Sequence, residues 1–306
     1  MLATLTDQYF SDPDWIFERK LDGVRAVCMR EAGEEPHLWS RNHRSADASY
    51  PELVTALAEQ GGESFVADGE IVAFDGDQTS FAKLQPRIHV NDPAKAKATG
   101  IPVVYYLFDL LEYDGKDART LPLRQRKELL RQAFDFRDPL RLSMHKVGAG
   151  ERFLQQACER GWEGLIAKRA DAPYTSGRSR DWLKFKCVSD QEFVVGGFTD
   201  PSGARAGFGA LLIGYYSGTD LHYAGKVGTG YDDATLRDLR RRLDDLASAE
   251  SPFAGQVREP RAHWVRPEMV VQVRFSEWTG DGRLRHPRFT GLRNDKAAHE
   301  VVREVP

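Results

Sequence analysis

The chain has 306 residues, a length typical of two domains, and 41% of them are hydrophobic, as in globular proteins. No apolar run approaches the roughly 18 residues that a membrane-spanning helix needs. The formal net charge of −3 gives no general attraction to nucleic acid, so a nucleic-acid-binding face would have to be local.

The predicted elements of the first part alternate strands and helices. A strand, a turn and a second strand are expected over residues 15–30. Further on, helices are expected at 51–60, 123–134 and 151–160, and strands at 65–74, 103–111, 165–168 and 182–186.

The pattern changes after Cys187. Short β-rich segments separated by glycine follow, and one helical stretch over 235–247 interrupts them. Several short strands with one helix are typical of a small antiparallel barrel of the oligonucleotide-binding (OB) type. We therefore predict two domains, residues 1–188 and 189–306.

The three cysteines, Cys28, Cys158 and Cys187, match neither a disulfide framework nor a zinc site. This favours a reducing, cytoplasmic compartment. The acidic and aromatic N-terminal stretch has no secretory pattern, so no export signal is expected.

A candidate reactive site lies in the turn after residue 19. Lys20 can act as a nucleophile, Asp22 can hold the lysine or a metal ion, and Gly23 allows close backbone approach. Arg25 can bond a ribose or phosphate oxygen. A lone Lys-x-Asp-Gly turn on the surface is common, so this pattern alone is not decisive.

Three further polar patterns follow, each with an ordinary structural alternative. Ser40-Arg41-Asn42 can be a loop between strands. Asp68-Gly69-Glu70 places two carboxylates inside an apolar strand, which is costly unless they are bonded, although a sheet-edge turn is also possible. Phe108 is by default a core residue, and Asp109 a turn residue.

Two lysine-containing strands complete the set. Glu163 stands before a predicted strand that ends at Lys168. In residues 182–186 the period of two places Lys184 and Lys186 on one face. An anion between them would offset their repulsion, whereas the alternative is an edge strand protected by lysines.

Taken in order, these patterns resemble the motif set of the covalent nucleotidyltransferases, which comprise DNA ligases, RNA ligases and capping enzymes. The C-terminal Arg293-Asn294-Asp295-Lys296 adds the last motif of that set. The chain is most similar to the ligase module of bacterial end-joining DNA ligases of the ligase D type. The resemblance implies an α+β fold: a nucleotidyltransferase domain with antiparallel sheets and flanking helices, then an OB-fold β-barrel domain.

The resemblance also implies roles around the nucleotide. Lys20 would carry AMP, and Glu18 would accept a hydrogen bond from the adenine amino group, which favours ATP over GTP. Phe108 would stack on the purine, with Ile166 on its other face. Arg25 and Glu70 would contact the ribose. Glu163, assisted by Glu70 or Asp22, would bind Mg²⁺ or Mn²⁺.

The remaining roles concern phosphate and DNA. Lys184 and Lys186 would contact the α-phosphate. Arg41 would grip the 5′-phosphate of a nick, and Asp295 and Lys296 would orient the departing pyrophosphate. Arg288 and Arg293 would bind DNA. Arg283 and Arg285 add local basic charge, or else belong to a solvated surface loop.

The predicted function is an ATP-dependent DNA ligase that seals 5′-phosphate and 3′-hydroxyl ends in duplex DNA, in repair or end joining. The expected form is a cytoplasmic, nucleoid-associated monomer without membrane contact, acting alone or with a Ku-type end-binding protein and separate polymerase and nuclease partners. The nineteen residues before Lys20 leave no room for a nicotinamide-binding domain, which disfavours an NAD-dependent ligase. The alternatives are an RNA ligase, a capping guanylyltransferase, or a catalytically silent nucleic-acid-binding protein.

Overall fold

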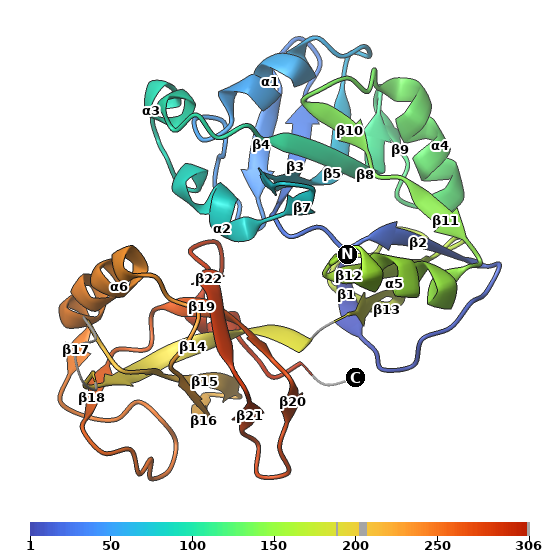
Figure 1. Cartoon of the computed structure of the whole chain (residues 1–306). Helices are drawn as coiled ribbons and strands as arrows, with labels where there is room; N and C mark the ends of the chain where they lie inside the picture. The colour runs from blue at the N-terminus through green and yellow to red at the C-terminus, as the bar shows by residue number, and fades with distance from the viewer. Residues whose placement is uncertain (188, 202–206, 305–306) are drawn as a thin grey trace. The chain divides into compact units, whose positions relative to one another are not determined.

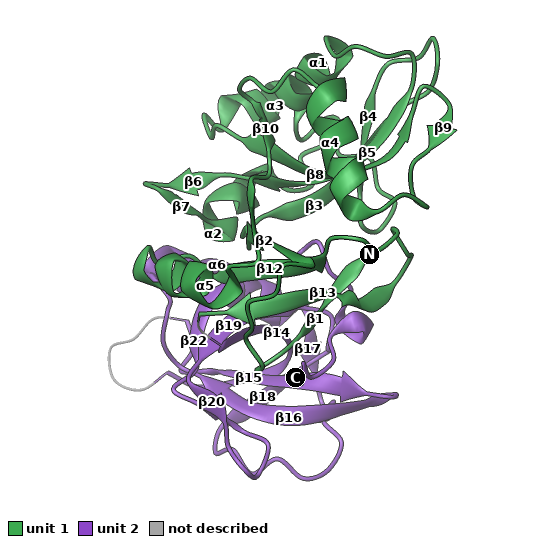
Figure 2. Cartoon of the chain, turned by 90° about the vertical axis from the view of Figure 1, so that its right-hand side faces the viewer, with its two compact units in different colours: residues 1–187, 305–306 green, residues 188–304 purple. Residues whose placement is uncertain are grey.

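The chain divides into two compact units, Met1–Cys187 and Val188–Glu304 (Figure 1, Figure 2). The structure, a computed structural model, describes residues 1–187, 189–201 and 207–304. Val188, the predicted domain boundary, lies outside the described residues. Within the described ranges, no helix has the length and apolar character needed to cross a membrane.

The first sheet of unit 1 has the strand order β10-β8-β5-β3-β4, with β9 added beside β8. Strand β3 alternates buried and partly exposed residues, which is the pattern of a sheet with one face on the core. The core face carries Ala26, Cys28, Ile71, Tyr105 and Leu107. The elements are β3 (Val24–Arg30), β4 (His37–Ser40), β5 (Phe65–Val72), β8 (Val104–Tyr113), β9 (Lys116–Asp117), β10 (Leu140–Leu142), α1 (Pro51–Ala58), α3 (Pro93–Ala98) and α4 (Leu123–Ala133).

The second sheet of unit 1 has the order β1-β13-β12-β2-β11. Helix α5 packs against β2 and β12, and Phe17, Phe153, Leu165 and Phe185 form the core between them. The elements are β1 (Leu2–Leu5), β2 (Trp15–Arg19), β11 (His145–Val147), α5 (Gly150–Glu159), β12 (Gly164–Arg169) and β13 (Arg178–Lys186). A small hairpin and two short helices complete the unit: β6 (Phe74–Asp75), β7 (Gln78–Thr79), α2 (Phe81–Leu84) and η1 (Gln85–Arg87).

Unit 2 is built around the long strand β14, which pairs with β15, β18 and β19. Helix α6 starts at the N-cap Asp232 and buries Leu236, Leu239 and Leu243 in the core of this unit. The elements are β14 (Ser189–Thr199), β15 (Leu211–Ser217), β16 (Asp220–Val227), α6 (Asp233–Asp245), β17 (Ala247–Ser248), β18 (Ala262–Val265), β19 (Val270–Phe275), β20 (Glu277–Trp278), β21 (Leu284–Arg285), β22 (Arg288–Leu292) and η2 (Ala298–Glu300).

The predicted α+β class is confirmed, with two corrections. The sheets of unit 1 are mixed, because β1 pairs with β13 and β10 pairs with β8 in the parallel sense. Parallel neighbours need a crossover, and α4 provides it between β8 and β10. In unit 2, the strand pairings among the described residues branch at β14 and do not close into a barrel.

The prediction for the cysteines was wrong. Cys158 and Cys187 form a disulfide, with 5.3 Å between their Cα atoms, and Cys28 is free and buried. Cys158 belongs to α5, and Cys187 follows β13 directly. Because α5 packs on the sheet that contains β13, two cysteines separated by 29 positions meet. Counting cysteines cannot reveal this proximity.

Candidate active site

Lys20 and Glu163 form an ion pair at the ends of two neighbouring strands. Lys20 follows β2, and Glu163 precedes β12, which runs antiparallel to β2. The amide of Lys20 donates to the carbonyl of Gly164 at 2.9 Å, which continues the pairing into the turn. The pair is partly accessible, with side-chain exposures of 18% and 11%. The sequence places these residues 143 positions apart, and the strand register brings them together.

The same register aligns other predicted residues on one polar face of this sheet. Glu18 lies opposite Ile166, and Ile166 opposite Lys184. In the next row, Lys186 lies opposite Gly164. Residues directly opposite each other in a sheet point to the same side. Lys184 and Lys186 therefore share the side of the nucleophile candidate, away from the core residues Leu165 and Phe185.

The facing side of the other sheet contributes Arg25 and Phe108. Arg25 donates from Nε and Nη2 to the two carboxylate oxygens of Asp68, at 2.9 and 2.5 Å, and also to the carbonyl of Met1. Asp68 is fully buried and accepts a further bond from the Tyr174 hydroxyl at 2.8 Å. Burial alone raises the pKa of Asp68, but the charge and hydrogen bonds of Arg25 bring it below its usual value.

Phe108 connects the two sheets. Phe108 is 8% exposed and packs with Met1 and Trp182. The ammonium of Lys168, on β12, lies 4.2 Å from the centre of the Phe108 ring and 4.1 Å from that of Trp182. These contacts are of the cation–π type. A face of Phe108 is thus contacted by a cation that the sequence interpretation did not assign.

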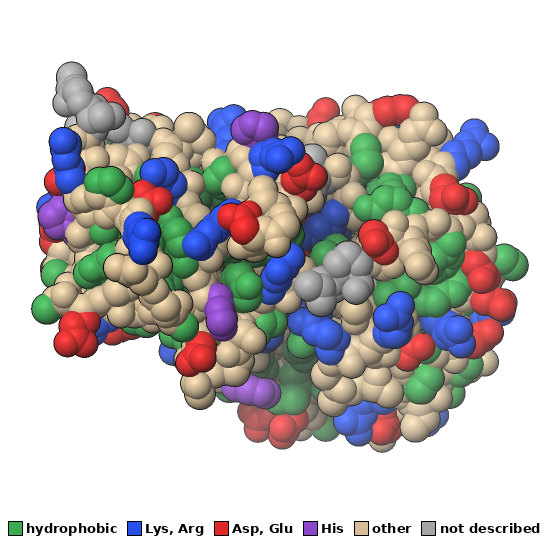
Figure 3. Space-filling model, turned by 90° about the horizontal axis from the view of Figure 1, so that it is seen from below, with side chains coloured by type: hydrophobic (Ala, Val, Ile, Leu, Met, Phe, Trp, Pro, Cys, Tyr) green, Lys and Arg blue, Asp and Glu red, His purple; other side chains and the backbone are tan. Residues whose placement is uncertain are grey.

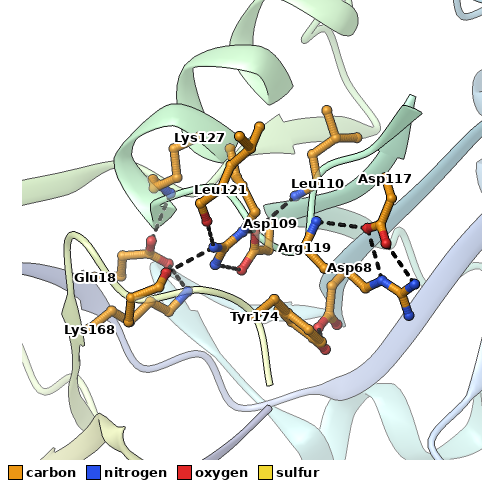
Figure 4. A network of polar contacts seen from close by, with 12 residues as sticks. Glu18, Asp68, Asp109, Leu110, Asp117, Arg119, Leu121, Lys127, Lys168 and Tyr174 are labelled. Atoms are coloured by element: carbon orange, nitrogen blue, oxygen red, sulfur yellow. Dashed lines mark hydrogen bonds and ion pairs between the residues drawn. The ribbon is translucent and has the colours of Figure 1, made fainter. Parts of the chain in front are cut away.

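Glu18 belongs to a buried polar network (Figure 4). Its Oε1 accepts from Lys127 at 2.7 Å, and its Oε2 accepts from Lys168 at 2.9 Å and from the Ser143 hydroxyl at 2.8 Å. Burial by itself raises the pKa of Glu18, but the two ammonium groups lower it to about 2. Burial likewise lowers the pKa of Lys168, and Glu18 partly opposes this. Glu18 is therefore held in its ionised form.

Asp22 and Gly23 have structural partners that lie far from them in the sequence. The Asp22 carboxylate accepts from the amide of Phe81 at 3.0 Å, at the start of α2. A Cβ atom at Gly23 would lie 2.2 Å from the carbonyl oxygen of Ile71, so the close approach allowed by glycine here is to β5. Arg41 is exposed in the turn after β4, and Glu70 lies opposite Arg25 across β3 and β5.

The last motif forms its own cluster in unit 2. Arg293 donates from Nε and Nη2 to Asp295 at 2.9 and 2.7 Å, and Lys296 pairs with Glu192 of β14 at 3.0 Å. The two cations are thus matched by two carboxylates. Arg288 is exposed on β22. Arg283 lies over the Tyr223 ring and donates to the Tyr223 carbonyl, and Arg285 pairs with Glu277.

Sequence reasoning missed several residues of the network, notably Lys127, Arg126 and Ser143. It also took Asp109 for a turn residue by default. That was wrong, because Asp109 lies within β8 and is completely buried. The sequence of α4 did contain a signal for Arg126 and Lys127 as buried cations. Leu123, Arg126, Lys127 and Leu130 are its buried residues, at the i, i+3, i+4 and i+7 positions of one helix face. Two cations on an apolar face predict buried acidic partners.

The fold and the lysine–carboxylate site define a protein of the covalent nucleotidyltransferase class. Residues 1–186 match the family described as ATP dependent DNA ligase domain, and residues 204–296 match the ATP dependent DNA ligase C terminal region. The chain belongs to the ATP-dependent DNA ligase family.

Individual relatives are similar over the whole chain. A multifunctional non-homologous end joining protein LigD of Pseudomonas aeruginosa is 39% identical over 100% of the chain, which spans 36% of that protein. The multifunctional non-homologous end joining DNA repair protein LigD of Mycobacterium tuberculosis is 36% identical over 95% of the chain and 37% of that protein. A solved structure of mycobacterial DNA ligase D complexed with ATP and MES is 34% identical, with a TM-score of 0.70 over 99% of this chain and 97% of that one.

Proposed function

We propose that this chain seals 5′-phosphate and 3′-hydroxyl ends of duplex DNA with ATP, in DNA repair by end joining. The observation that carries the proposal is the Lys20–Glu163 pair on the polar face that also holds Lys184 and Lys186. A primary amine beside cations that can bind phosphate is the arrangement that a lysyl-AMP intermediate requires. The likeness to a ligase D structure solved with ATP supports the choice of nucleotide.

The reaction consists of three transfers. The Lys20 amine attacks the α-phosphate, a bond to AMP forms, and pyrophosphate leaves. The DNA 5′-phosphate then takes AMP from Lys20. Finally the 3′-hydroxyl attacks that 5′-phosphate, which closes the strand and releases AMP. Since the ion pair with Glu163 favours the ammonium form of Lys20, this pair has to open before the first attack.

Around the nucleotide, we assign Glu18 to the adenine amino group, Phe108 and Ile166 to the faces of the purine, and Glu70 to the ribose. Arg25, whose guanidinium is held by Asp68, is assigned to the ribose as well. The contact of Arg41 with the 5′-phosphate, and those of Arg288 and Arg293 with DNA, are part of the same proposal. On the face drawn in Figure 3, basic and acidic side chains are interspersed, so local arginines rather than net charge would attract DNA.

A divalent cation, Mg²⁺ or Mn²⁺, fits this site as a partner of the substrate. Among the described residues, no three His, Cys, Asp or Glu side chains gather in a metal-binding group. Mg²⁺ in phosphoryl-transfer sites is commonly held by one or two carboxylates together with substrate phosphates. Glu163, with Glu70, would hold the ion, which would neutralise charge on the phosphates when bound.

We place the two units in the roles of nucleotidyltransferase domain and OB-fold domain, joined by a hinge near residues 187–191. Asp295 and Lys296 would act on pyrophosphate in the first transfer only. The name of the LigD relatives supports end joining as the process. A Ku-type partner, separate polymerase and nuclease partners, and a cytoplasmic, nucleoid-associated place of action belong to this proposal.

The test is covalent labelling with ATP that carries ³²P in its α-phosphate. Lys20→Ala abolishes the label, but still seals a nick that is already adenylylated, at a reduced rate. Lys116→Ala, an exposed lysine of β9, is the control and keeps the label. Persistent labelling of Lys20→Ala would place the nucleophile elsewhere. Sealing of nicked RNA in preference to nicked DNA would assign the chain to another class of ligase.

A further inference from the structure

Lys127 is a buried cation of α4 that the proposed reaction does not use. Its side chain is 4% exposed, and its Nζ donates to Glu18 Oε1 at 2.7 Å and to the main-chain carbonyl of Ser143 at 3.0 Å. Figure 4 shows Glu18 between Lys127 and Lys168. Burying an ammonium group is costly unless it is paired and hydrogen-bonded. Two acceptors, the Glu18 carboxylate and the Ser143 carbonyl, offset the cost of burying the ammonium group of Lys127 and hold it in one place.

The hydrogen bonds to Glu18 are distributed unevenly over its two oxygens. Within the described part of the chain, Oε2 accepts two bonds, from Lys168 and Ser143, whereas Oε1 accepts one, from Lys127. Each carboxylate oxygen offers about two acceptor positions. The protein therefore saturates Oε2 and leaves one acceptor position on Oε1, beside the bond from Lys127.

This carboxylate borders the proposed purine site. Glu18 lies directly opposite Ile166, and Lys168 bonds Glu18 while its ammonium lies 4.2 Å from the centre of the Phe108 ring. Lys168 thus contacts both the Glu18 carboxylate and the ring of Phe108. Lys127 contacts Glu18 from α4, and among the described residues its other hydrogen-bond partner is the main-chain carbonyl of Ser143. Lys127 can therefore act on a bound base through Glu18.

We infer that Lys127 is a positioning residue for base selection: it fixes the Glu18 carboxylate so that the remaining acceptor of Oε1 meets a hydrogen-bond donor on carbon 6 of the purine. Adenine carries an amino group there, whereas guanine carries a carbonyl, which would face a carboxylate without a proton between them. The inference rests on the proposed function, because it assumes that the pocket binds a purine nucleotide.

The experiment uses the full chain and two nucleotides. The rate of covalent labelling is measured as kcat/KM with ATP and with purine riboside triphosphate, which lacks a substituent on carbon 6. A hydrogen bond to a charged acceptor makes the wild-type ratio about 10 to 100. Lys127→Met removes the cation and keeps a similar length, and we expect it to lower the ratio by about tenfold, mainly through ATP. Arg131→Met also replaces a cation by methionine, but at an exposed position of α4, and keeps the ratio.

The possible outcomes distinguish a failure of the role inferred for Lys127 from a failure of the proposed ligase function. If Lys127→Met slows both nucleotides equally and keeps the ratio, Lys127 only stabilises the fold and the inference is overturned. A wild-type ratio near one overturns it too, while leaving the ligase proposal intact. A wild-type chain that takes no label from ATP refutes the function itself. Should Lys127→Met fail to fold, Lys127→Gln replaces it, because glutamine carries no charge and is one bond shorter than lysine: a lowered ratio supports the inference and an unchanged ratio refutes it.

Discussion

Asp109 and Arg126 form a completely enclosed ion pair, in which Nε and Nη2 of the guanidinium donate to the two carboxylate oxygens at 2.7 and 2.9 Å. Burial raises the pKa of Asp109, and Arg126 opposes that shift. Nη1 of Arg126 donates to the main-chain carbonyls of Leu121 and Ala172. One side chain thus joins β8, the start of α4 and the segment after β12.

We expect Arg126→Met to lower the free energy of unfolding by about 3–5 kcal/mol, because it leaves a buried carboxylate without its partner. Chemical denaturation measures the change. The double variant Asp109→Leu/Arg126→Met should regain most of the loss, since no buried charge then remains. Arg131→Met is the exposed control on the same helix. A double variant no more stable than the single one would contradict this explanation.

Acid should weaken the fold through Glu18. The folded-state pKa of Glu18 is about 2, against 4.5 for the free group. Its contribution to stability is therefore fully present above pH 4.5 and is lost as the pH falls toward 2, by an amount on the order of 3 kcal/mol. The difference in unfolding free energy between wild type and Glu18→Gln should shrink over this window. A constant difference from pH 6 to pH 2.5 would show that Glu18 is not held in its ionised form, and Glu35→Gln is the exposed control.

The role proposed for Asp295 in the departure of pyrophosphate predicts a defect confined to the first transfer. Asp295→Ala removes this carboxylate, while Arg293 keeps an ion pair with Glu192 at 3.8 Å. Labelling by ATP should fall by tenfold or more, on the order of the 1.5–3 kcal/mol of a charge-assisted bond. Sealing of a pre-adenylylated nick should stay near normal. Asp220→Ala, a change at the exposed first residue of β16 in the same unit, is the control. Equal loss in both assays would assign Asp295 to the fold or to DNA binding.

Reduction should destabilise unit 1. The disulfide between Cys158 and Cys187 closes a loop over a separation of 29 residues, for which chain entropy gives about 3–4 kcal/mol. A reducing agent should lower the melting temperature of the wild type, and it should leave Cys158→Ser unchanged. Identical melting with and without the agent would mean that the bond adds nothing to the stability.

Much of the site was predictable because its chemistry is local in the sequence. Lys20, Asp22 and Gly23 form one turn, and the alternation in β13 already placed Lys184 and Lys186 on one face. The roles of Asp22 and Asp109 were harder to predict, because each depends on a partner elsewhere in the chain. Asp22 accepts a hydrogen bond from the amide of Phe81, the first residue of α2, and Asp109 pairs with Arg126 of α4.

The sequence by itself determined the order of the motifs, the helices and strands with regular apolar spacing, and the family. These depend on nearest neighbours and on residue identity. Only the tertiary structure decided which charges meet. Glu18 and Lys127 are 109 positions apart, and Glu18 and Lys168 are 150 apart, yet strand register and the packing of α4 place both lysines on one carboxylate. The cost of leaving a buried charge unpaired makes these contacts specific, and that cost appears only when the chain folds.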